Sequence, residues 1–128
     1  MNILLDSHAL VWALLKDHRL SPRARHILRD PPGTLNISII SLWELSLKIT
    51  IGKLRTLGSS IAYFRDECRE QGIEIIPLRM EHILRAETLP LYHCDPFDRL
   101  LIAQALEENL AILTDDAHIR HYPVKVVW

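Results

Sequence analysis

The chain has few of the residues that build disulfide scaffolds and glycine-rich phosphate loops, and it has no long apolar run of the kind that spans a membrane. Its 128 residues include two cysteines, Cys68 and Cys94, and four glycines. The two cysteines form no Cys-x-x-Cys pair, so we expect free thiols in a reducing compartment rather than a disulfide framework. No apolar run approaches the roughly 20 residues that a membrane-spanning helix needs. A secreted disulfide scaffold and a membrane protein are therefore both disfavoured.

A strong charge of one sign is also missing. The 15 Lys and Arg residues are balanced by 16 Asp and Glu residues, which gives a formal net charge of −1 at pH 7. This balance argues against a strongly basic nucleic-acid clamp but leaves room for a local patch. The first residues show no basic leader followed by an apolar segment. We therefore expect a soluble, cytoplasmic protein that makes no use of a membrane.

The residues that are present have the composition of one globular domain. Hydrophobic residues make up 48% of the chain and charged residues 24%. A chain of this length can bury about two-thirds of its unfolded surface, and no repeat or linker divides it. We expect a single domain over residues 1–128.

Short apolar runs alternate with helical patterns along the whole sequence. Strands are expected at 3–5, 35–39, 74–76, 110–113 and 124–127, with helices over 7–15, 22–29, 41–51, 60–71, 79–86, 95–108 and 117–121. This alternation is typical of an α/β fold with a mainly parallel central sheet and helices on both faces. The strand at 74–76 is followed by Pro77 and is expected near a sheet edge. Residues 52–60 are expected to form a loop.

The segment after the second strand fits two patterns. Ser41-Leu42-Trp43-Glu44 matches a helix capping box, whereas the four apolar residues at 45, 47, 49 and 51 alternate as they would in a strand. We let the capping signal decide for a helix. Glu44 then caps that helix, and its spacing to Lys48 also allows an ion pair within the helix.

Acidic residues follow several of the predicted strands. Asp6 ends the first strand, Glu44 lies about one turn beyond the second, and Asp115 and Asp116 follow the strand at 110–113. Asp98 lies in the first turn of the helix that begins near Asp95. Ligands of parallel sheets bind at the carboxyl ends of the strands, so all of these acids can face one rim.

Several carboxylates at one rim repel one another unless a cation neutralises them. Sets of carboxylate and water ligands suit Mg²⁺ and Mn²⁺. These ions polarise phosphate, generate a hydroxide nucleophile and stabilise the leaving oxygen. The acids therefore indicate metal-dependent phosphodiester hydrolysis, which requires no serine, cysteine or histidine nucleophile.

Each candidate also has an ordinary structural explanation. Asp95 is a good N-cap before Pro96, and Asp115 or Asp116 can cap the short helix that follows. The cations that can meet substrate phosphates are also residues that commonly stay solvated; they are Lys48, Lys53, Arg55 and Arg99. The histidines give no clear site, because His118 and His121 lack a companion Cys/His pair for zinc. His93, beside Cys94, fits no nucleophile triad.

Four stretches, taken in order, resemble one family. They are Leu4-Leu5-Asp6-Ser7-His8-Ala9-Leu10, Ser41-Leu42-Trp43-Glu44-Leu45-Ser46-Leu47-Lys48, Asp95-Pro96-Phe97-Asp98-Arg99-Leu100-Leu101-Ile102-Ala103-Gln104-Ala105, and Thr114-Asp115-Asp116 with Tyr122-Pro123-Val124. With these motifs the sequence resembles the PIN-domain ribonucleases, in particular the toxins of bacterial VapBC-type toxin–antitoxin pairs. The resemblance spans nearly the entire chain.

This resemblance implies an α/β/α sandwich and a metal-dependent endonuclease that acts on RNA. It implies a homodimer held inactive by a cognate antitoxin. The implied catalytic acids and ligands of Mg²⁺ or Mn²⁺ are Asp6, Glu44, Asp98 and Asp116, and the implied supporting hydroxyl residues are Ser7 and Thr114. The tandem acids leave open whether Asp115 or Asp116 is the fourth acid. Cys94 departs from the family, where a basic residue is more usual.

Two other functions fit an α/β chain of this size. A receiver-like signalling domain also places acids at strand ends, but it has paired acids after the first strand, whereas Asp6 is single. A non-catalytic interaction module can keep the same fold, although the complete acidic set weighs against it. We therefore expect a metal-dependent endoribonuclease, the toxin of a type II toxin–antitoxin system.

Overall fold

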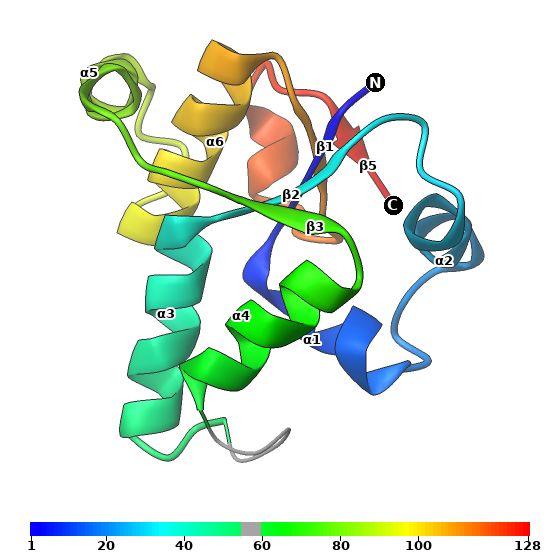
Figure 1. Ribbon diagram of the computed structural model, residues 1–128. Helices are drawn as coiled ribbons and strands as arrows, with labels where there is room; N and C mark the ends of the chain where they lie inside the picture. Colours follow the sequence, from blue (N-terminus) through cyan, green and yellow to red (C-terminus); the bar gives the residue numbers. More distant parts are fainter. Residues whose placement is uncertain (55–59) are drawn as a thin grey trace.

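The computed structural model describes residues 1–54 and 60–128 (Figure 1). The strands are β1 (Ile3–Leu5), β2 (Leu35–Ser38), β3 (Ile73–Ile76), β4 (Ala111–Leu113) and β5 (Val126–Val127). The helices are α1 (Ser7–Leu15), α2 (Pro22–Arg29), α3 (Ile39–Thr50), α4 (Ile61–Glu70), α5 (Met80–Thr88), α6 (Pro96–Glu108) and the 3₁₀ helix η2 (Ile119–His121). Arg55 and most of the loop predicted over 52–60 lie outside the described residues.

Within the described residues, five strands form one parallel sheet in the order β3-β2-β1-β4-β5. In the central strand, Leu4 of β1 lies opposite Asn36 of β2 on one side and Ile112 of β4 on the other. The predicted α/β fold with a parallel sheet is therefore confirmed. The prediction that the third strand lies at an edge is also confirmed, because β3 is the first strand of the order.

The strand order reverses direction at the centre of the sheet. From β1 the chain moves outward to β2 and then β3, and it then crosses back to add β4 and β5 on the other side of β1. The segments leaving β1 and β4 therefore diverge from neighbouring strands. In open parallel sheets, a crevice for ligands forms at this switch point, at the carboxyl ends of the strands.

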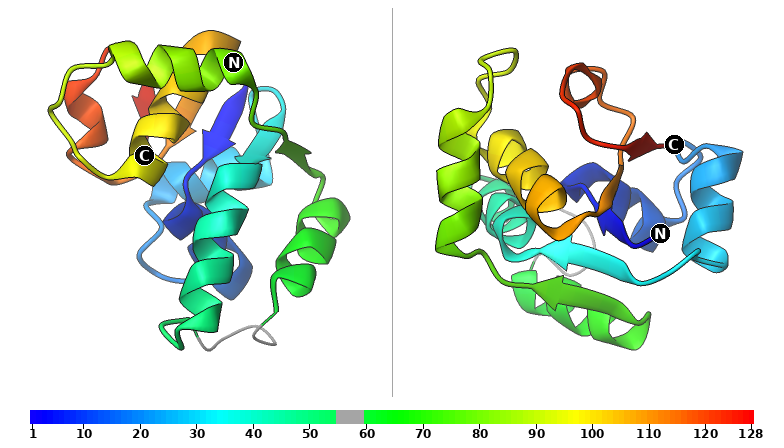
Figure 2. Two further views of the ribbon diagram at one scale, coloured as in Figure 1. Left: turned by 90° about the vertical axis from the view of Figure 1, so that its left-hand side faces the viewer. Right: turned by 90° about the horizontal axis from the view of Figure 1, so that it is seen from above.

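Two hydrophobic cores cover the two faces of the sheet. Ile3 and Leu5 pack with Leu10 and Phe64, from α1 and α4, in the first core. Side chains alternate along a strand, so the neighbours of these residues face the other way. The second core holds one central residue from each of β1 and β4, packed with residues of α6 and η2; it includes Leu4, Ile112, Ile102 and Ile119. Figure 2 shows helices on both sides of the strands, the sandwich that was expected.

Burial of these side chains supplies much of the stability of the fold. Leu4, Leu5, Ile102 and Ile112 are all 0% exposed. Each fully buried side chain of this type contributes about 1.5 to 3 kcal/mol relative to an exposed one. The strands nearest the functional rim are therefore held rigidly from both faces.

The predicted start of α3 was wrong by about one turn. The helix begins at Ile39, and the Oγ of Ser38 accepts a hydrogen bond from the backbone N–H of Ile40 at 3.2 Å. Ser41 therefore lies within the first turn, and the capping-box interpretation of Glu44 does not hold. The choice of a helix over a strand for this segment is confirmed, so the apolar alternation at 45, 47, 49 and 51 did not indicate a strand.

The other helix ends agree with the sequence signals. Asn109 ends α6 in the left-handed conformation with φ of 54°, and Gly72 follows α4 with φ of 71°. The last elements are shorter than predicted, because η2 spans three residues and β5 spans two. No helix in residues 1–54 or 60–128 is both long enough and apolar enough to cross a membrane.

Candidate metal centre

The Asp6 carboxylate lies at the switch point, where β1 ends and α1 begins. Its Oδ1 accepts a hydrogen bond from the backbone N–H of Ala9 at 2.7 Å, which makes Asp6 the N-cap of α1. The backbone N–H of Asp6 donates to the carbonyl oxygen of Leu113 in β4 at 3.3 Å. Asp6 is only 6% exposed. The acid is therefore fixed between a helix start and the neighbouring strand.

The hydroxyl of Thr114 links Asp6 to Asp116. Thr114 follows β4 and is 0% exposed. Its Oγ1 donates a short hydrogen bond to the Oδ2 of Asp6 and accepts one from the backbone N–H of Asp116 at 3.1 Å. Two acids that are far apart in the sequence are thus held at the ends of adjacent strands by one buried hydroxyl group.

The start of α6 positions Asp98. The Oδ1 of Asp95 accepts hydrogen bonds from the backbone N–H groups of Phe97 at 2.8 Å and Asp98 at 3.2 Å. Asp95 therefore caps the helix, as its place before Pro96 predicted. Because the cap is made by Asp95, the carboxylate of Asp98 is free for other partners.

Asp98 and Asp116 converge with a histidine. The Nε2 of His93 lies 2.8 Å from the Oδ2 of Asp98. One ligand atom each from His93, Asp98 and Asp116 lie within 4.8 Å of one another. Each of these residues is partly exposed. The three side chains form a small polar cluster that solvent and small ions can reach.

Burial and mutual repulsion disfavour the ionised form of these acids. Burial raises the pKa of Asp6 from its ordinary 3.8 to about 6; hydrogen bonds from Thr114 and Ala9 and the charge of His8 oppose the rise, and the charge of Asp98 adds to it. The pKa of Asp98 is also raised, mainly by burial, with further contributions from the charges of Asp95 and Asp116 and an opposing hydrogen bond from His93.

This donor set fits a divalent cation. Carboxylates that are partly desolvated and close enough to raise one another's pKa are stabilised when a cation shares their charge. Oxygen donors predominate in the cluster, and such sets suit Mg²⁺ and Mn²⁺. The residues that would hold the ion are Asp98 and Asp116, with Asp6 beside them at the end of β1.

Glu44 lies on α3, and the geometry does not tie it to the cluster. Its carboxylate lies 3.7 Å from the Nζ of Lys48, in the ion pair that the spacing predicted, and its side chain is 16% exposed. Helix α3 packs against both α1 and α6, the helices that begin at the other acids. The assignment of Glu44 to the metal centre remains a prediction.

Arg99 is engaged with the backbone of the loop before α6. Its two terminal nitrogens donate to four carbonyl oxygens at 2.9 to 3.4 Å, those of Ala86, Leu89, Pro90 and His93. Nη1 also donates to the hydroxyl of Tyr122 at 3.3 Å. The guanidinium therefore holds the loop that carries His93. Contact between Arg99 and substrate phosphate remains a prediction that these bonds make less favourable.

The remaining predicted residues lie around the cluster. Asp116 is partly buried and bonded to Thr114, whereas Asp115 is exposed; this contrast favours Asp116 as the fourth acid. Ser7 is 5% exposed at the first position of α1. Lys48 pairs with Glu44 and keeps 33% of its side chain exposed. The roles of Ser7, Lys48 and Asp115 at the site remain predictions.

From the sequence, His93 was considered only as a member of a nucleophile triad and not as a neighbour of the acids. It stands five residues before Asp98 in a loop, and nothing in the local pattern shows which way its ring turns. The ring stacks on that of His118, with centroids 4.9 Å apart and planes 6° apart. The only hint in the sequence was a histidine close to a helix start that carries two acids.

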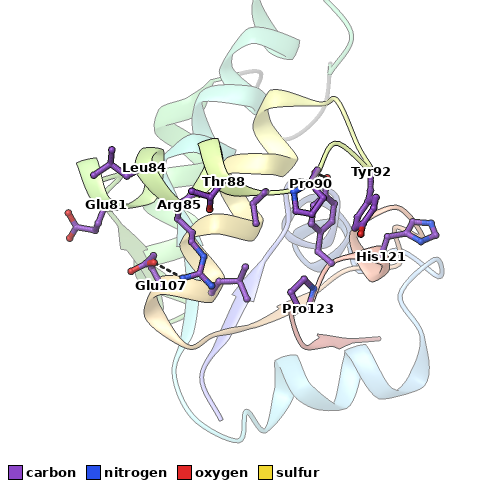
Figure 3. Close-up of a pocket in the computed structure, with 12 residues that line it drawn as sticks. Glu81, Leu84, Arg85, Thr88, Pro90, Tyr92, Glu107, His121 and Pro123 are labelled. Atoms are coloured by element: carbon purple, nitrogen blue, oxygen red, sulfur yellow. Dashed lines mark hydrogen bonds and ion pairs between the residues drawn. The ribbon is translucent and has the colours of Figure 1, made fainter.

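A separate cavity lies away from the acids. It has a volume of about 910 Å³ and is lined by residues of α5, α6 and the segment around Tyr122 (Figure 3). Its side chains include Arg85 and Glu107, which pair at 3.0 Å, together with Tyr92 and Pro123. Among the described residues that line it, none belongs to the predicted acidic set. The cavity is therefore not part of the acid cluster.

Comparisons with solved structures find the same fold in other proteins. A structure of VapBC2 from Rickettsia felis bound to a DNA fragment from its promoter is similar over 99% of this chain and 98% of the other, with a TM-score of 0.73 and 17% identity. A toxin–antitoxin complex from Klebsiella pneumoniae is similar over 98% and 96%, with a TM-score of 0.69 and 20% identity. A structure of DNA-bound VapBC from Salmonella typhimurium is similar over 99% and 97%, with a TM-score of 0.73 and 13% identity.

These likenesses establish the fold alone, because identity is low. Among curated proteins, no sequence matches the chain. The family model for the PIN domain matches residues 3–125, almost the entire sequence. The chain therefore belongs to the PIN domain family.

Proposed function

We propose that this protein is a metal-dependent endoribonuclease and the toxin of a type II toxin–antitoxin pair. The observation that carries the proposal is the convergence of Asp98 and Asp116 at the switch point of a PIN-family sheet, where the charge of Asp98 also acts on Asp6. A cluster of acids disfavours a phosphate-bearing substrate unless a cation intervenes. Metal-assisted phosphodiester hydrolysis resolves this conflict.

Each side chain has a role that follows from its position in the fold. When bound, the cation neutralises the charge that develops on phosphate and lowers the pKa of water. Asp98 and Asp116 would hold it, and Thr114 keeps one oxygen of Asp6 in place through its hydroxyl. Glu44, from α3, positions the attacking water in this proposal. The N-terminus of α6 adds a positive dipole end that favours negative charge nearby.

RNA is the substrate, and a cognate antitoxin is the partner. The structural neighbours include complexes described as VapBC and as a toxin–antitoxin complex, which supports a regulatory protein partner for this chain. We further propose that the protein is a homodimer and acts in the cytoplasm. Two free cysteines, Cys68 and Cys94, agree with a reducing compartment.

The first test is cleavage of total RNA and transfer RNA by protein purified free of any antitoxin. Wild type, Asp98→Asn and Asp66→Asn are each incubated with Mg²⁺, with Mn²⁺ and with EDTA. Asp66 is a matched control because its side chain is 62% exposed and pairs with Arg65, its neighbour on α4. Wild type and Asp66→Asn should cut RNA only with metal, and Asp98→Asn should not cut.

Other outcomes separate the alternatives. No cutting of RNA together with no binding of metal would favour a non-catalytic interaction module. Stable phosphorylation of an aspartate by a small phosphodonor would favour a receiver-like domain. Cutting that persists in EDTA or in Asp98→Asn would overturn the proposed mechanism.

A further inference from the structure

The loop before α6 adds a nitrogen donor to an otherwise oxygen-rich cluster. We propose that His93 is a ligand of the same cation that Asp98 and Asp116 hold, so that the centre favours an imidazole-accepting transition ion such as Mn²⁺ over Mg²⁺. This inference rests on the proposed function, since it concerns the cation at that site.

The donor separations are compatible with one ion. Nε2 of His93 and Oδ2 of Asp98 are 2.8 Å apart. Adjacent ligands of an octahedral ion with bonds of about 2.1 Å lie about 3 Å apart. The ligand atoms of His93, Asp98 and Asp116 all lie within 4.8 Å of one another, slightly beyond the roughly 4.2 Å between opposite ligands of such an ion. Less than about 1 Å of closing movement brings the three donors onto one centre.

The backbone of His93 is held in place from both sides. Its N–H donates to the hydroxyl of Tyr122 at 2.9 Å, and its carbonyl oxygen accepts from Nη1 of Arg99 at 3.4 Å. The same Tyr122 hydroxyl donates to the carbonyl oxygen of Pro90 at 2.7 Å. Ligands of a metal site need this kind of support, because loosely held side chains bind metals weakly.

The ring of His93 is also oriented, and its orientation is connected to Asp116. The ring lies flat on His118 at 4.9 Å. The backbone N–H of His118 donates to Oδ1 of Asp116 at 2.8 Å. The segment that carries Asp116 and His118 therefore positions both the ring that stacks on His93 and the acid on the other side of the cluster.

A nitrogen ligand changes which ion the site prefers. Mg²⁺ is a hard ion that takes oxygen ligands and keeps several waters, whereas first-row transition ions accept imidazole. A purely carboxylate site has no such bias. Loss of His93 should therefore weaken binding of Mn²⁺ far more than binding of Mg²⁺.

The test is the electron spin echo of Mn²⁺ bound to the antitoxin-free protein, which reports directly coordinated ¹⁴N. Wild type is compared with His93→Gln, which keeps a polar side chain of similar reach but removes the imidazole. Two further variants, His8→Gln and His26→Gln, are matched controls. His8 lies close enough to lower the pKa of Asp6, and His26 is exposed on α2.

We expect ¹⁴N modulation in wild type and in both control variants, and its loss in His93→Gln. The Kd for Mn²⁺ should rise about tenfold or more in His93→Gln, since even indirect partners of metal ligands are worth 10- to 100-fold. The Kd for Mg²⁺ should change by less than about twofold, because an oxygen-seeking ion gains little from imidazole.

Three results would overturn the inference: bound Mn²⁺ with no ¹⁴N modulation, modulation that survives in His93→Gln, or no binding of Mn²⁺ by wild type. RNA cleavage is measured separately on the same samples. A nitrogen-coordinated Mn²⁺ in a protein that cuts no RNA would leave the His93 assignment standing while the nuclease proposal fails.

Discussion

The two halves of the candidate metal centre are built in different ways. The strand half consists of Asp6, Thr114 and Asp116, which follow β1 and β4 and are joined through one buried hydroxyl. The loop half consists of His93 and Asp98, placed by a helix cap and by a loop held to Arg99 and Tyr122. The first half depends on the sheet, and the second depends on hydrogen bonds of the irregular backbone.

The strand half is therefore rigid, whereas the loop half can adapt. The strand half cannot move without disturbing two fully buried strands. The loop half has Asp98 with 21% of its side chain exposed and His93 with 18%, so it can shift slightly as an ion enters. Changes in the strand half should therefore alter stability and chemistry together, whereas changes in the loop half should alter metal affinity first.

The largest effect is expected from Asp6→Asn. Loss of the charged oxygen should lower RNA cleavage more than about a hundredfold, since even outer partners of metal ligands are worth 10- to 100-fold. The free energy of unfolding of the variant should, by contrast, be higher than that of wild type at neutral pH. Folding raises the pKa of Asp6 to about 6, so the folded state binds this proton more tightly than the unfolded state, and stability falls as pH rises from about 4 to 6.

Asp6→Asn removes that loss of stability. In EDTA at pH 7.5, the variant should be more stable than wild type by up to about 3 kcal/mol, at about 1.4 kcal/mol for each pKa unit. This difference in the free energy of unfolding between the variant and wild type should become smaller as pH falls to 4.5. Urea unfolding at the two pH values measures it, and a variant that is less stable than wild type at pH 7.5 would contradict the argument.

The next largest effect is expected from Thr114→Val, which keeps the shape of the side chain but removes its hydroxyl. A buried hydrogen bond to a charged group contributes about 1.5 to 3 kcal/mol, so unfolding at pH 7.5 should show a loss of this size. Cleavage should fall about tenfold to a hundredfold as Asp6 and Asp116 lose their link. Thr114→Ser, which keeps the hydroxyl, should retain most of both properties.

Arg99→Met tests the loop half. Four carbonyl oxygens lose a charged donor, and we expect a loss of about 2 kcal/mol in stability with faster amide exchange over residues 89–94. Affinity for Mn²⁺ should fall while exchange in β1 stays unchanged. Arg85→Met is the control, because the pair of Arg85 with Glu107 is a surface pair worth less than about 1 kcal/mol. Equal exchange changes in both variants would remove the distinction between the halves.

The smallest effect is expected from Lys48→Met. The pair with Glu44 spans 3.7 Å on a helix surface, and such pairs contribute about 0.3 to 0.5 kcal/mol. Stability should change by no more than this amount. A large drop in RNA affinity with unchanged stability would instead assign Lys48 to the substrate, as the sequence suggested.

Much of the strand half could be predicted from the sequence. An acid directly after a short apolar run, as in Leu4-Leu5-Asp6, indicates a strand end, and the alternation of elements indicates a parallel sheet. Together these patterns place Asp6 and Asp116 at one rim. The helix start at Asp95-Pro96 could be predicted equally well, because capping depends on residues that are close together in sequence.

The placement of His93 and the surroundings of Glu44 could not be predicted in the same way. The position of the His93 ring depends on Tyr122 and His118, which are distant in sequence. It also depends on the guanidinium of Arg99, which the sequence suggested as a contact for substrate phosphate. The capping signal at Ser41 failed because Ser38, three residues earlier, offered the same hydroxyl closer to the end of β2. Local patterns specify local bonds, and these contacts are not local.

The position of β1 in the sheet also bears on how the protein is made. Asp6, which follows β1, precedes Thr114 by 108 residues, and β1 acquires its β4 neighbour only after β4 has been synthesised. Domains fold as units during synthesis, so Asp6 lacks its Thr114 partner until then. A nascent chain that has not yet released β4 from the ribosome therefore lacks the assembled centre, and any reaction that the centre supports begins only after that point.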